Sequence, residues 1–93
     1  MDNFKELISS DEKTIVKFGA SWCGPCRIAD KAIKQVLELG HKRVYSIDVE
    51  DFKELGFEYQ IKSLPTWIVF KNGLPVEKFV GIKKAEELIQ KLK

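Results

Sequence analysis

The chain contains four short stretches rich in β-branched and aromatic residues, a composition typical of β-strands. They cover residues 14–18, 44–49, 66–70 and 76–80. Hydrophobic and polar residues alternate in the second stretch, whereas the first and third are almost continuously apolar and predict buried strands. Asn72-Gly73 lies between the last two stretches and predicts a β-hairpin.

Amphipathic patterns elsewhere predict helices. The longest helix ends at about Leu39, before Gly40. Its apolar stripe comprises Ile28, Ala29, Ala32, Ile33, Val36 and Leu37. Three shorter helices are expected at residues 2–9, 51–58 and 83–92. In the second of these, Phe52 and Leu55 are expected to face inward.

The expected elements follow the order α-β-α-β-α-β-β-α. Helices separate the first three strands and a hairpin joins the last two, which implies a mixed four-stranded sheet sandwiched by helices. The chain has 93 residues, of which 44% are hydrophobic. We therefore interpret residues 1–93 as a single α/β domain.

Charge and composition exclude several classes of protein. The formal net charge is +2, and lysines alternate with acidic residues instead of clustering, so nucleic-acid binding is not indicated. The first 13 residues contain no apolar segment, and no apolar run approaches membrane-spanning length, so neither a signal peptide nor a membrane anchor is expected. Two cysteines make no disulfide framework, and a cytoplasmic location is expected.

The two cysteines lie in the segment Trp22-Cys23-Gly24-Pro25-Cys26, at the start of the longest helix. The thiolate is the reactive form of cysteine, and a helix N-terminus stabilises negative charge. Cys23, at the mouth of the helix and open to solvent, is therefore the expected attacking thiol. Cys26, about one turn further in, is the expected second thiol. Pro25 suits the first helical turn, and Gly24 has no side chain to block a partner.

Two other roles for this pair are disfavoured. A purely structural disulfide would close a very short loop and would constrain little of the unfolded chain. A zinc site usually needs four ligands, and the chain adds only His41 to the two cysteines. His41 follows the longest helix, where a solvated basic residue suits the helix dipole. We therefore expect no metal site.

The segment from Trp22 to Cys26 also resembles the active-site motif of thioredoxins, including the Gly-Pro dipeptide between the cysteines. Other stretches are similar to thioredoxins at the expected spacing, namely Asp48-Val49-Glu50-Asp51, Leu64-Pro65-Thr66, Phe70-Lys71-Asn72-Gly73 and Val80-Gly81. The resemblance implies a thioredoxin fold in a short version that lacks the family's usual first strand. It also implies the activity of a protein-disulfide oxidoreductase.

The resemblance further implies a cis peptide bond between Leu64 and Pro65, beside the cysteines. Leu64 would then present its backbone to an extended substrate segment through strand-type hydrogen bonds. The implied substrate-binding surface comprises Trp22, Gly24, Pro25, Leu64, Pro65, Gly81 and Ile82. For Trp22, the alternative is an ordinary core aromatic residue.

Disulfide exchange at this site would need no bound cofactor. By resemblance, the partners are disulfide-containing proteins and an NADPH-dependent thioredoxin reductase, and a monomer is expected. Two alternatives stay open. One is a glutaredoxin-like protein served by glutathione, against which the Gly-Pro dipeptide argues. The other is a binding module that uses the thioredoxin surface without turnover.

Lys17 departs from the family pattern, in which a buried acid usually stands six residues before the first cysteine. Strand alternation puts Ile15, Lys17 and Gly19 on one face, which by resemblance lies beneath the active-site helix close to Cys26. Lys17 is therefore a candidate catalytic residue. A neutral amine would accept the proton of Cys26, and a charged one would favour the Cys26 thiolate. The alternative is that Lys17 extends to solvent along its apolar stem.

Overall fold

The computed structural model describes residues 2–93, with only the backbone of Asp2, and places them in four helices and four strands. In chain order these are α1 (Asp2–Leu7), β1 (Thr14–Gly19), α2 (Gly24–Glu38), β2 (Val44–Asp48), α3 (Lys53–Glu58), β3 (Thr66–Lys71), β4 (Leu74–Val80) and α4 (Ala85–Leu92). The predicted order of elements is confirmed.

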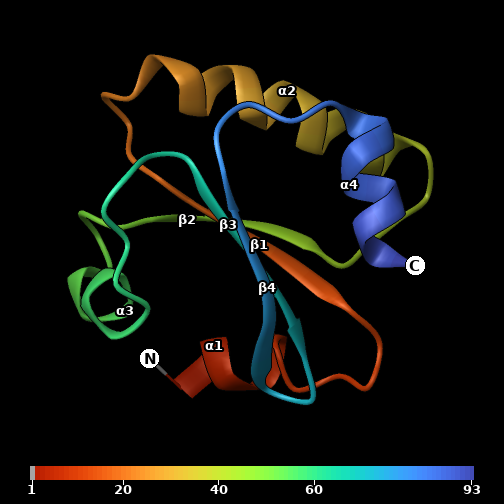
Figure 1. Ribbon diagram of the computed structural model, residues 1–93, viewed down its shortest axis with the longest axis horizontal. Helices are drawn as coiled ribbons and strands as arrows, with labels where there is room; N and C mark the ends of the chain where they lie inside the picture. Colours follow the sequence, from red (N-terminus) through yellow and green to blue (C-terminus); the bar gives the residue numbers. More distant parts are fainter. Residues whose placement is uncertain (1) are drawn as a thin grey trace.

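The strands form one mixed sheet in the order β2-β1-β3-β4. β1 runs parallel to β2 and antiparallel to β3, and β3 pairs antiparallel with β4. Figure 1 shows α2 and α4 on one side of the sheet and α1 and α3 on the other. The mixed four-stranded sheet sandwiched by helices, predicted from the sequence, is therefore present.

Each side of the sheet has its own hydrophobic core. On the side of α2 and α4, Ile15 and Trp67 pack against apolar residues of α2 and against Leu88. On the side of α1 and α3, Phe4 and Phe18 pack with further aliphatic and aromatic residues. Every residue of β1 is buried. This explains why the sequence of β1 is almost continuously apolar, because both of its faces lie against a core.

Three elements begin two residues away from their predicted starts, and α1 ends at Leu7 instead of residue 9. α3 begins at Lys53, because the carbonyl oxygen of Asp48 accepts hydrogen bonds from the amides of Asp51 and Phe52 at 3.2 and 3.1 Å. This turn leaves Phe52 39% exposed, so its predicted inward position is wrong. β4 begins at Leu74, two residues before the predicted start, and α4 begins at Ala85.

The start of β4 follows from the turn that precedes it. Asn72 and Gly73 both have positive φ, of 54° and 80°, as a tight two-residue hairpin requires. Lys71 and Leu74 are therefore already paired across the hairpin. In the part of the chain that the structure describes, no helix is both long enough and apolar enough to span a membrane.

Candidate active site at the start of helix α2

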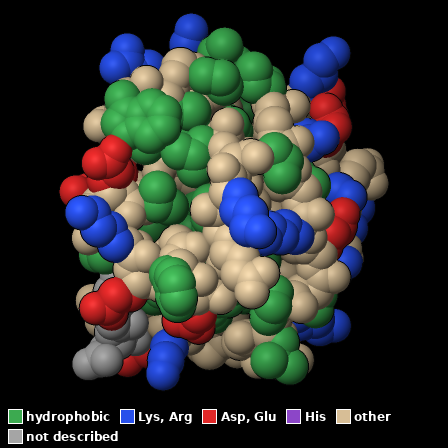
Figure 2. All heavy atoms as spheres, turned by 60° about the vertical axis from the view of Figure 1, so that its left-hand side comes forward, with side chains coloured by type: hydrophobic (Ala, Val, Ile, Leu, Met, Phe, Trp, Pro, Cys, Tyr) green, Lys and Arg blue, Asp and Glu red, His purple; other side chains and the backbone are tan. Residues whose placement is uncertain are grey.

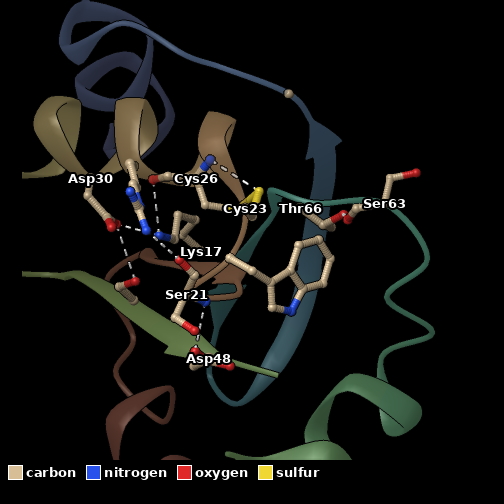
Figure 3. Close-up of a disulfide and its surroundings, with 12 residues drawn as sticks. Lys17, Ser21, Cys23, Cys26, Asp30, Asp48, Ser63 and Thr66 are labelled. Atoms are coloured by element: carbon tan, nitrogen blue, oxygen red, sulfur yellow. Dashed lines mark hydrogen bonds and ion pairs between the residues drawn. A yellow bond between two sulfur atoms is a disulfide. The ribbon is translucent and has the colours of Figure 1, made fainter. Parts of the chain in front are cut away.

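The two cysteines lie at the connection between β1 and α2. A short loop follows Gly19, and Cys23 is the N-cap residue of the helix, with extended backbone angles. Its sulfur accepts a hydrogen bond from the backbone N–H of Cys26 at 3.2 Å. Cys23 and Cys26 are joined in a disulfide (Figure 3). The first turn of α2 therefore directs a backbone donor at the Cys23 sulfur, where it would stabilise a thiolate.

Cys23 is more enclosed than the sequence suggested. Cys23 is 5% exposed and Cys26 is 1% exposed, so the expectation of a solvent-open Cys23 is wrong for this disulfide-bonded state. The reason is that Ala20 and Leu64 pack around the pair. Cys23 still lines a surface pocket to which Cys26 does not contribute, so Cys23 is the one that an incoming disulfide meets first.

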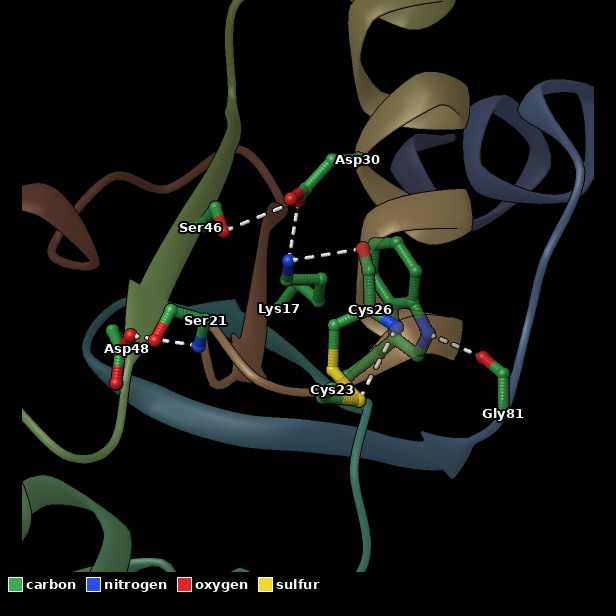
Figure 4. Close-up of polar contacts among 9 residues, drawn as sticks. Lys17, Ser21, Cys23, Cys26, Asp30, Ser46, Asp48 and Gly81 are labelled. Carbon is green, nitrogen blue, oxygen red and sulfur yellow. Dashed lines mark hydrogen bonds and ion pairs between the residues drawn. A yellow bond between two sulfur atoms is a disulfide. The ribbon is translucent and has the colours of Figure 1, made fainter.

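Asp48 holds the loop that leads to Cys23. Its carboxylate accepts a hydrogen bond from the backbone N–H of Ser21 at 3.1 Å (Figure 4) and another from the backbone N–H of Glu50 at 2.7 Å. The amide of Val49 donates to the carbonyl of Gly19 at 2.9 Å. The sequence analysis assigned no role to Asp48. Its place as the last residue of the strand next to β1 was the available signal.

Trp22 is 67% exposed, so the alternative of a core aromatic is wrong. Its indole Nε1 donates a hydrogen bond to the carboxylate of Glu50. The indole is therefore kept at the surface beside the cysteines, although it buries little of its own area. Glu50 was not identified from the sequence as a residue of this site.

A shallow surface pocket of about 510 Å³ opens in front of Cys23. It is lined by Trp22, Cys23, Gly24, Pro25, Val49, Ile61, Lys62 and Leu64. Figure 2, which turns this side of the molecule forward, shows hydrophobic side chains gathered on it, with charged side chains around them. Of the predicted substrate-binding residues, the pocket brings together Trp22, Gly24, Pro25 and Leu64.

The remaining predicted binding residues lie next to the pocket but do not line it. The peptide bond between Leu64 and Pro65 is cis, and Pro65 is buried. The carbonyl of Pro65 accepts a hydrogen bond from the amide of Gly81 at 3.0 Å, which ties the end of β4 to this segment. Gly81 is held further by the indole Nε1 of Trp67, which donates to its carbonyl at 2.8 Å. Ile82, the next residue, is 49% exposed.

The sequence analysis missed Val49, Ile61 and Lys62, which line the pocket from the β2–α3 and α3–β3 connections. No local pattern distinguishes them, because only the packing of these connections against the start of α2 brings them to Cys23.

Lys17 lies beneath α2, as strand alternation together with the family resemblance predicted, and is only 3% exposed. Its Nζ forms an ion pair with the carboxylate of Asp30 and donates to the carbonyl oxygen of Cys26 at 3.4 Å (Figure 4). The alternative of a lysine that extends to solvent is therefore wrong, because its ammonium group is held by two acceptors from α2.

Asp30 is the partner that the sequence analysis did not identify. It lies four residues after Cys26, which places both on one side of the helix. Its side chain is 53% exposed and is also 3.5 Å from the hydroxyl of Ser46. The pair thus connects the buried surroundings of Cys26 with the surface of the molecule.

Gly19 leaves the space in which Lys17 and Cys26 approach each other. A Cβ at position 19 would lie 3.0 Å from the sulfur of Cys26 and 3.1 Å from Cε of Lys17. Both contacts are tighter than most real Cβ contacts, so a larger residue would require the sulfur or the lysine to shift by a few tenths of an ångström.

Among the described residues, no group of three or more His, Cys, Asp or Glu side chains is arranged to hold a metal ion. Around the two sulfur atoms, the structure places the backbone donor of the first helical turn and the Lys17–Asp30 pair.

Comparison with known proteins assigns this arrangement to a family. The thioredoxin family model matches residues 1–93, the whole chain. The chain belongs to the thioredoxin family. A chloroplastic thioredoxin Y of rice is 43% identical over 93 residues, which are 97% of this chain and 55% of the rice protein. A thioredoxin-like protein of Synechocystis is 39% identical over 95 residues, covering 97% of this chain and 89% of that protein.

Solved thioredoxin structures share the fold. The structure of a mutant thioredoxin from Halobacterium salinarum superimposes with a TM-score of 0.88, at 26% identity, over 99% of this chain and 81% of that one. The chain spans about half the length of several curated thioredoxins that it matches, including the rice protein and a bovine mitochondrial thioredoxin.

Proposed function

We propose that the protein is a thioredoxin-type protein-disulfide oxidoreductase that reduces disulfides in protein substrates through Cys23 and Cys26. The observation that carries this proposal is the disulfide at the N-terminus of α2, which lies beside a surface pocket edged by an exposed tryptophan. Once reduced, the pair supplies two electrons as it returns to the disulfide, which is what reduction of one substrate disulfide requires.

In the first step, the Cys23 thiolate attacks one sulfur of the substrate disulfide. A bond forms between Cys23 and that sulfur, the substrate bond breaks, and the other substrate sulfur leaves as a thiolate that takes up a proton. The helix N-terminus favours the charged form of Cys23, because the N–H of Cys26 donates to its sulfur.

In the second step, the Cys26 sulfur attacks Cys23. The bond within the mixed disulfide breaks, the substrate leaves with its second thiol, and Cys23 and Cys26 are left oxidised. We assign Lys17 a supporting role here: its ammonium, held near Cys26 by Asp30, favours the Cys26 thiolate. Asp30 and the hydroxyl of Ser46 offer the departing proton a polar route to the surface.

The substrate segment is expected to lie in extended form across the pocket. Trp22, Gly24, Pro25 and Leu64 contact its side chains, and the backbone around Leu64 and Pro65 pairs with its main chain. Gly81 and Ile82 border this position, because Gly81 is hydrogen-bonded to Pro65. Pockets of apolar side chains with few polar groups suit many sequences, so a broad set of substrates fits this surface.

Regeneration requires a source of two electrons, for which we propose an NADPH-dependent thioredoxin reductase. A relative from Mycobacterium leprae, 33% identical over 91 residues, is named a bifunctional thioredoxin reductase/thioredoxin. We also propose a cytoplasmic location, supported by the lack of any cysteine beyond the active-site pair.

A coupled assay tests this proposal. The oxidised protein and an insulin substrate are supplied either with thioredoxin reductase and NADPH or with glutathione, glutathione reductase and NADPH. We expect NADPH consumption that depends on the protein only in the first mixture. Consumption only with glutathione would replace the proposal by a glutaredoxin-like activity. No consumption in either mixture would favour the binding module.

A further inference from the structure

Lys62 places a positive charge in the wall of the pocket in front of Cys23. Apart from Cys23 itself, the remaining residues that line this pocket have uncharged side chains. Lys62 is exposed, and the ion pairs formed among residues 3–93 do not include it. A substrate that enters the pocket therefore meets the Cys23 thiolate and one ammonium group.

The carboxylates near the active-site disulfide are bound to donors of the protein. That of Glu50 accepts from the indole of Trp22, and Glu50 does not line the pocket. That of Asp48 accepts from backbone amides, and that of Asp30 pairs with Lys17 beneath α2. The charge of Lys62 is therefore not offset by an acidic residue in the wall of the pocket.

The connection between α3 and β3 fixes the place of Lys62. On its N-terminal side, the amide of Ile61 donates to the carbonyl of Gly56 at 2.9 Å. On its C-terminal side, the hydroxyl of Thr66 donates to the carbonyl of Ser63. The backbone on both sides of Lys62 is thus held, while its flexible four-carbon stem lets the ammonium follow a charged group at several positions.

We propose that Lys62 gives the site a preference for disulfides whose cysteines are flanked by acidic residues. This proposal rests on the proposed reduction of protein disulfides and names the class of substrate that the site favours. An acidic residue beside the substrate cysteine is repelled by the Cys23 thiolate as the two sulfurs approach. The ammonium of Lys62, on the wall of the same pocket, attracts that residue and offsets the repulsion. A basic residue in the same place is repelled by Lys62.

The preference is modest because the contact forms at the surface. Ion pairs between exposed side chains change an equilibrium by about fivefold or less. We expect glutamate in place of glutamine beside the substrate cysteine to raise the second-order rate constant of reduction about two- to fivefold, and lysine to lower it by a similar factor. Added salt should reduce both effects, since it screens exposed charges.

Three synthetic disulfides test the preference. Each joins two identical capped peptides through their single cysteines, and the cysteine is flanked on both sides by glutamate, by glutamine or by lysine. With the same residue on both sides, the result does not depend on the direction in which the peptide lies. The reduced protein is mixed with each disulfide, and the released peptide thiol is measured after acid quenching. Each rate constant is divided by that of dithiothreitol with the same disulfide, which corrects for the intrinsic reactivity of the peptide.

Variants of Lys62 assign the preference to this residue. Lys62→Gln should bring the three normalised rate constants together, and Lys62→Glu should reverse their order. Lys71→Glu is the matched control, because it makes the same change of charge at an exposed residue at the other end of β3 from the site, and it should keep the wild-type order. Within one protein the same Cys23 thiolate meets all three peptides, so their order does not depend on how readily Cys23 ionises.

The outcomes separate this proposal from the proposed function. If the wild type reduces all three disulfides equally after normalisation, or if both Lys62 variants keep the wild-type order, the preference is refuted and disulfide reduction stands. A preference that persists unchanged at high salt would also overturn it, because it would not arise from an exposed charge. Reduction of all three disulfides no faster than by dithiothreitol would instead refute disulfide reduction, and the preference with it.

Discussion

Removing the charge of Lys17 and removing the charge of Asp30 should change the stability of the Cys26 thiolate in opposite directions. Lys17→Met keeps the apolar stem and removes the ammonium, which leaves the carboxylate of Asp30 near Cys26 without its partner. Asp30→Asn keeps the side-chain shape and leaves the ammonium uncompensated. The first variant should therefore disfavour the Cys26 thiolate, and the second should favour it.

The size of these effects follows from Coulomb's law. An ammonium roughly 6 Å from a thiolate stabilises it by about 3 kcal/mol at an effective dielectric of about 20. The carboxylate of Asp30 opposes this, and its effect is weakened because its side chain is 53% exposed. We expect the pH midpoint of resolution to fall by about one unit in Asp30→Asn and to rise by about one to two units in Lys17→Met.

The second phase of the reaction with an aromatic disulfide reagent reports resolution directly. Reduced protein is mixed with Ellman's reagent in stopped flow. Cys23 releases the first thionitrobenzoate, and the attack of Cys26 on the mixed disulfide releases the second. The rate of the second phase is measured against pH for the wild type, both single variants and the double variant, which should return toward the wild type. Lys34→Met and Glu38→Gln, which change exposed charges on the same helix, are the controls.

The stability of the variants separates this role from a structural one. Asp30→Asn leaves a buried ammonium without its ion-pair partner and should cost about 1–3 kcal/mol of unfolding free energy. Lys17→Met replaces the buried charge by an apolar group and should cost little. If the pH midpoints of all four proteins coincide while the stabilities differ, the pair only supports the fold, and the assignment of Lys17 to catalysis is refuted.

Four further predictions follow from the site and its surroundings. Cys26→Ser should accumulate mixed disulfides with substrate proteins on non-reducing gels, whereas Cys23→Ser should not; equal trapping would show that the roles are reversed or shared. Trp22→Ala should raise the KM for insulin with less change in kcat, while Leu74→Ala, which also removes a side chain that is 67% exposed, should change neither. Gly19→Ala should lower stability by about 1–3 kcal/mol in chemical denaturation, because its Cβ would press on the Cys26 sulfur; an unchanged midpoint would contradict the close packing. Burial, followed by the charge of Glu58, raises the pKa of Tyr59 above its ordinary value of 10.0. The contribution of Tyr59 to the free energy of unfolding should therefore be complete below pH 10.0 and should be lost as the pH rises through the pKa of the folded state. Tyr59→Phe should lack this decline.

Local patterns predicted the elements that carry the fold. β1 and β3 are buried on both faces, so their sequences are apolar enough to stand out. Gly40, with a φ of 97°, follows the end of α2 where a left-handed residue is needed. The start of α3 was predicted too early. The amides of Asp51 and Phe52 donate to the carbonyl of Asp48, so these two residues form a turn before the helix.

The parts of the site that were predicted are those that follow from residues adjacent in sequence or from the family resemblance. Contacts between residues that are distant in sequence were not predicted. Cys23 and Cys26 are fixed by their spacing, but the enclosure of Cys23 depends on Leu64, a residue distant in sequence. In the same way, strand alternation put Lys17 on one face with Ile15 and Gly19, and the family resemblance placed that face beneath α2. The partner of Lys17 could not be predicted, because the choice of Asp30 depends on which turn of α2 packs over β1.

The proposed function requires that the dithiol at the start of α2 turns over protein disulfides. Precipitation of the insulin B chain, followed by turbidity with dithiothreitol as the electron source, tests this most directly. We expect that a catalytic amount of the protein shortens the lag and raises the rate above that of dithiothreitol alone, and that Cys23→Ser removes this effect. A rate equal to that of dithiothreitol alone for the wild-type protein would show that the dithiol does not turn over protein disulfides.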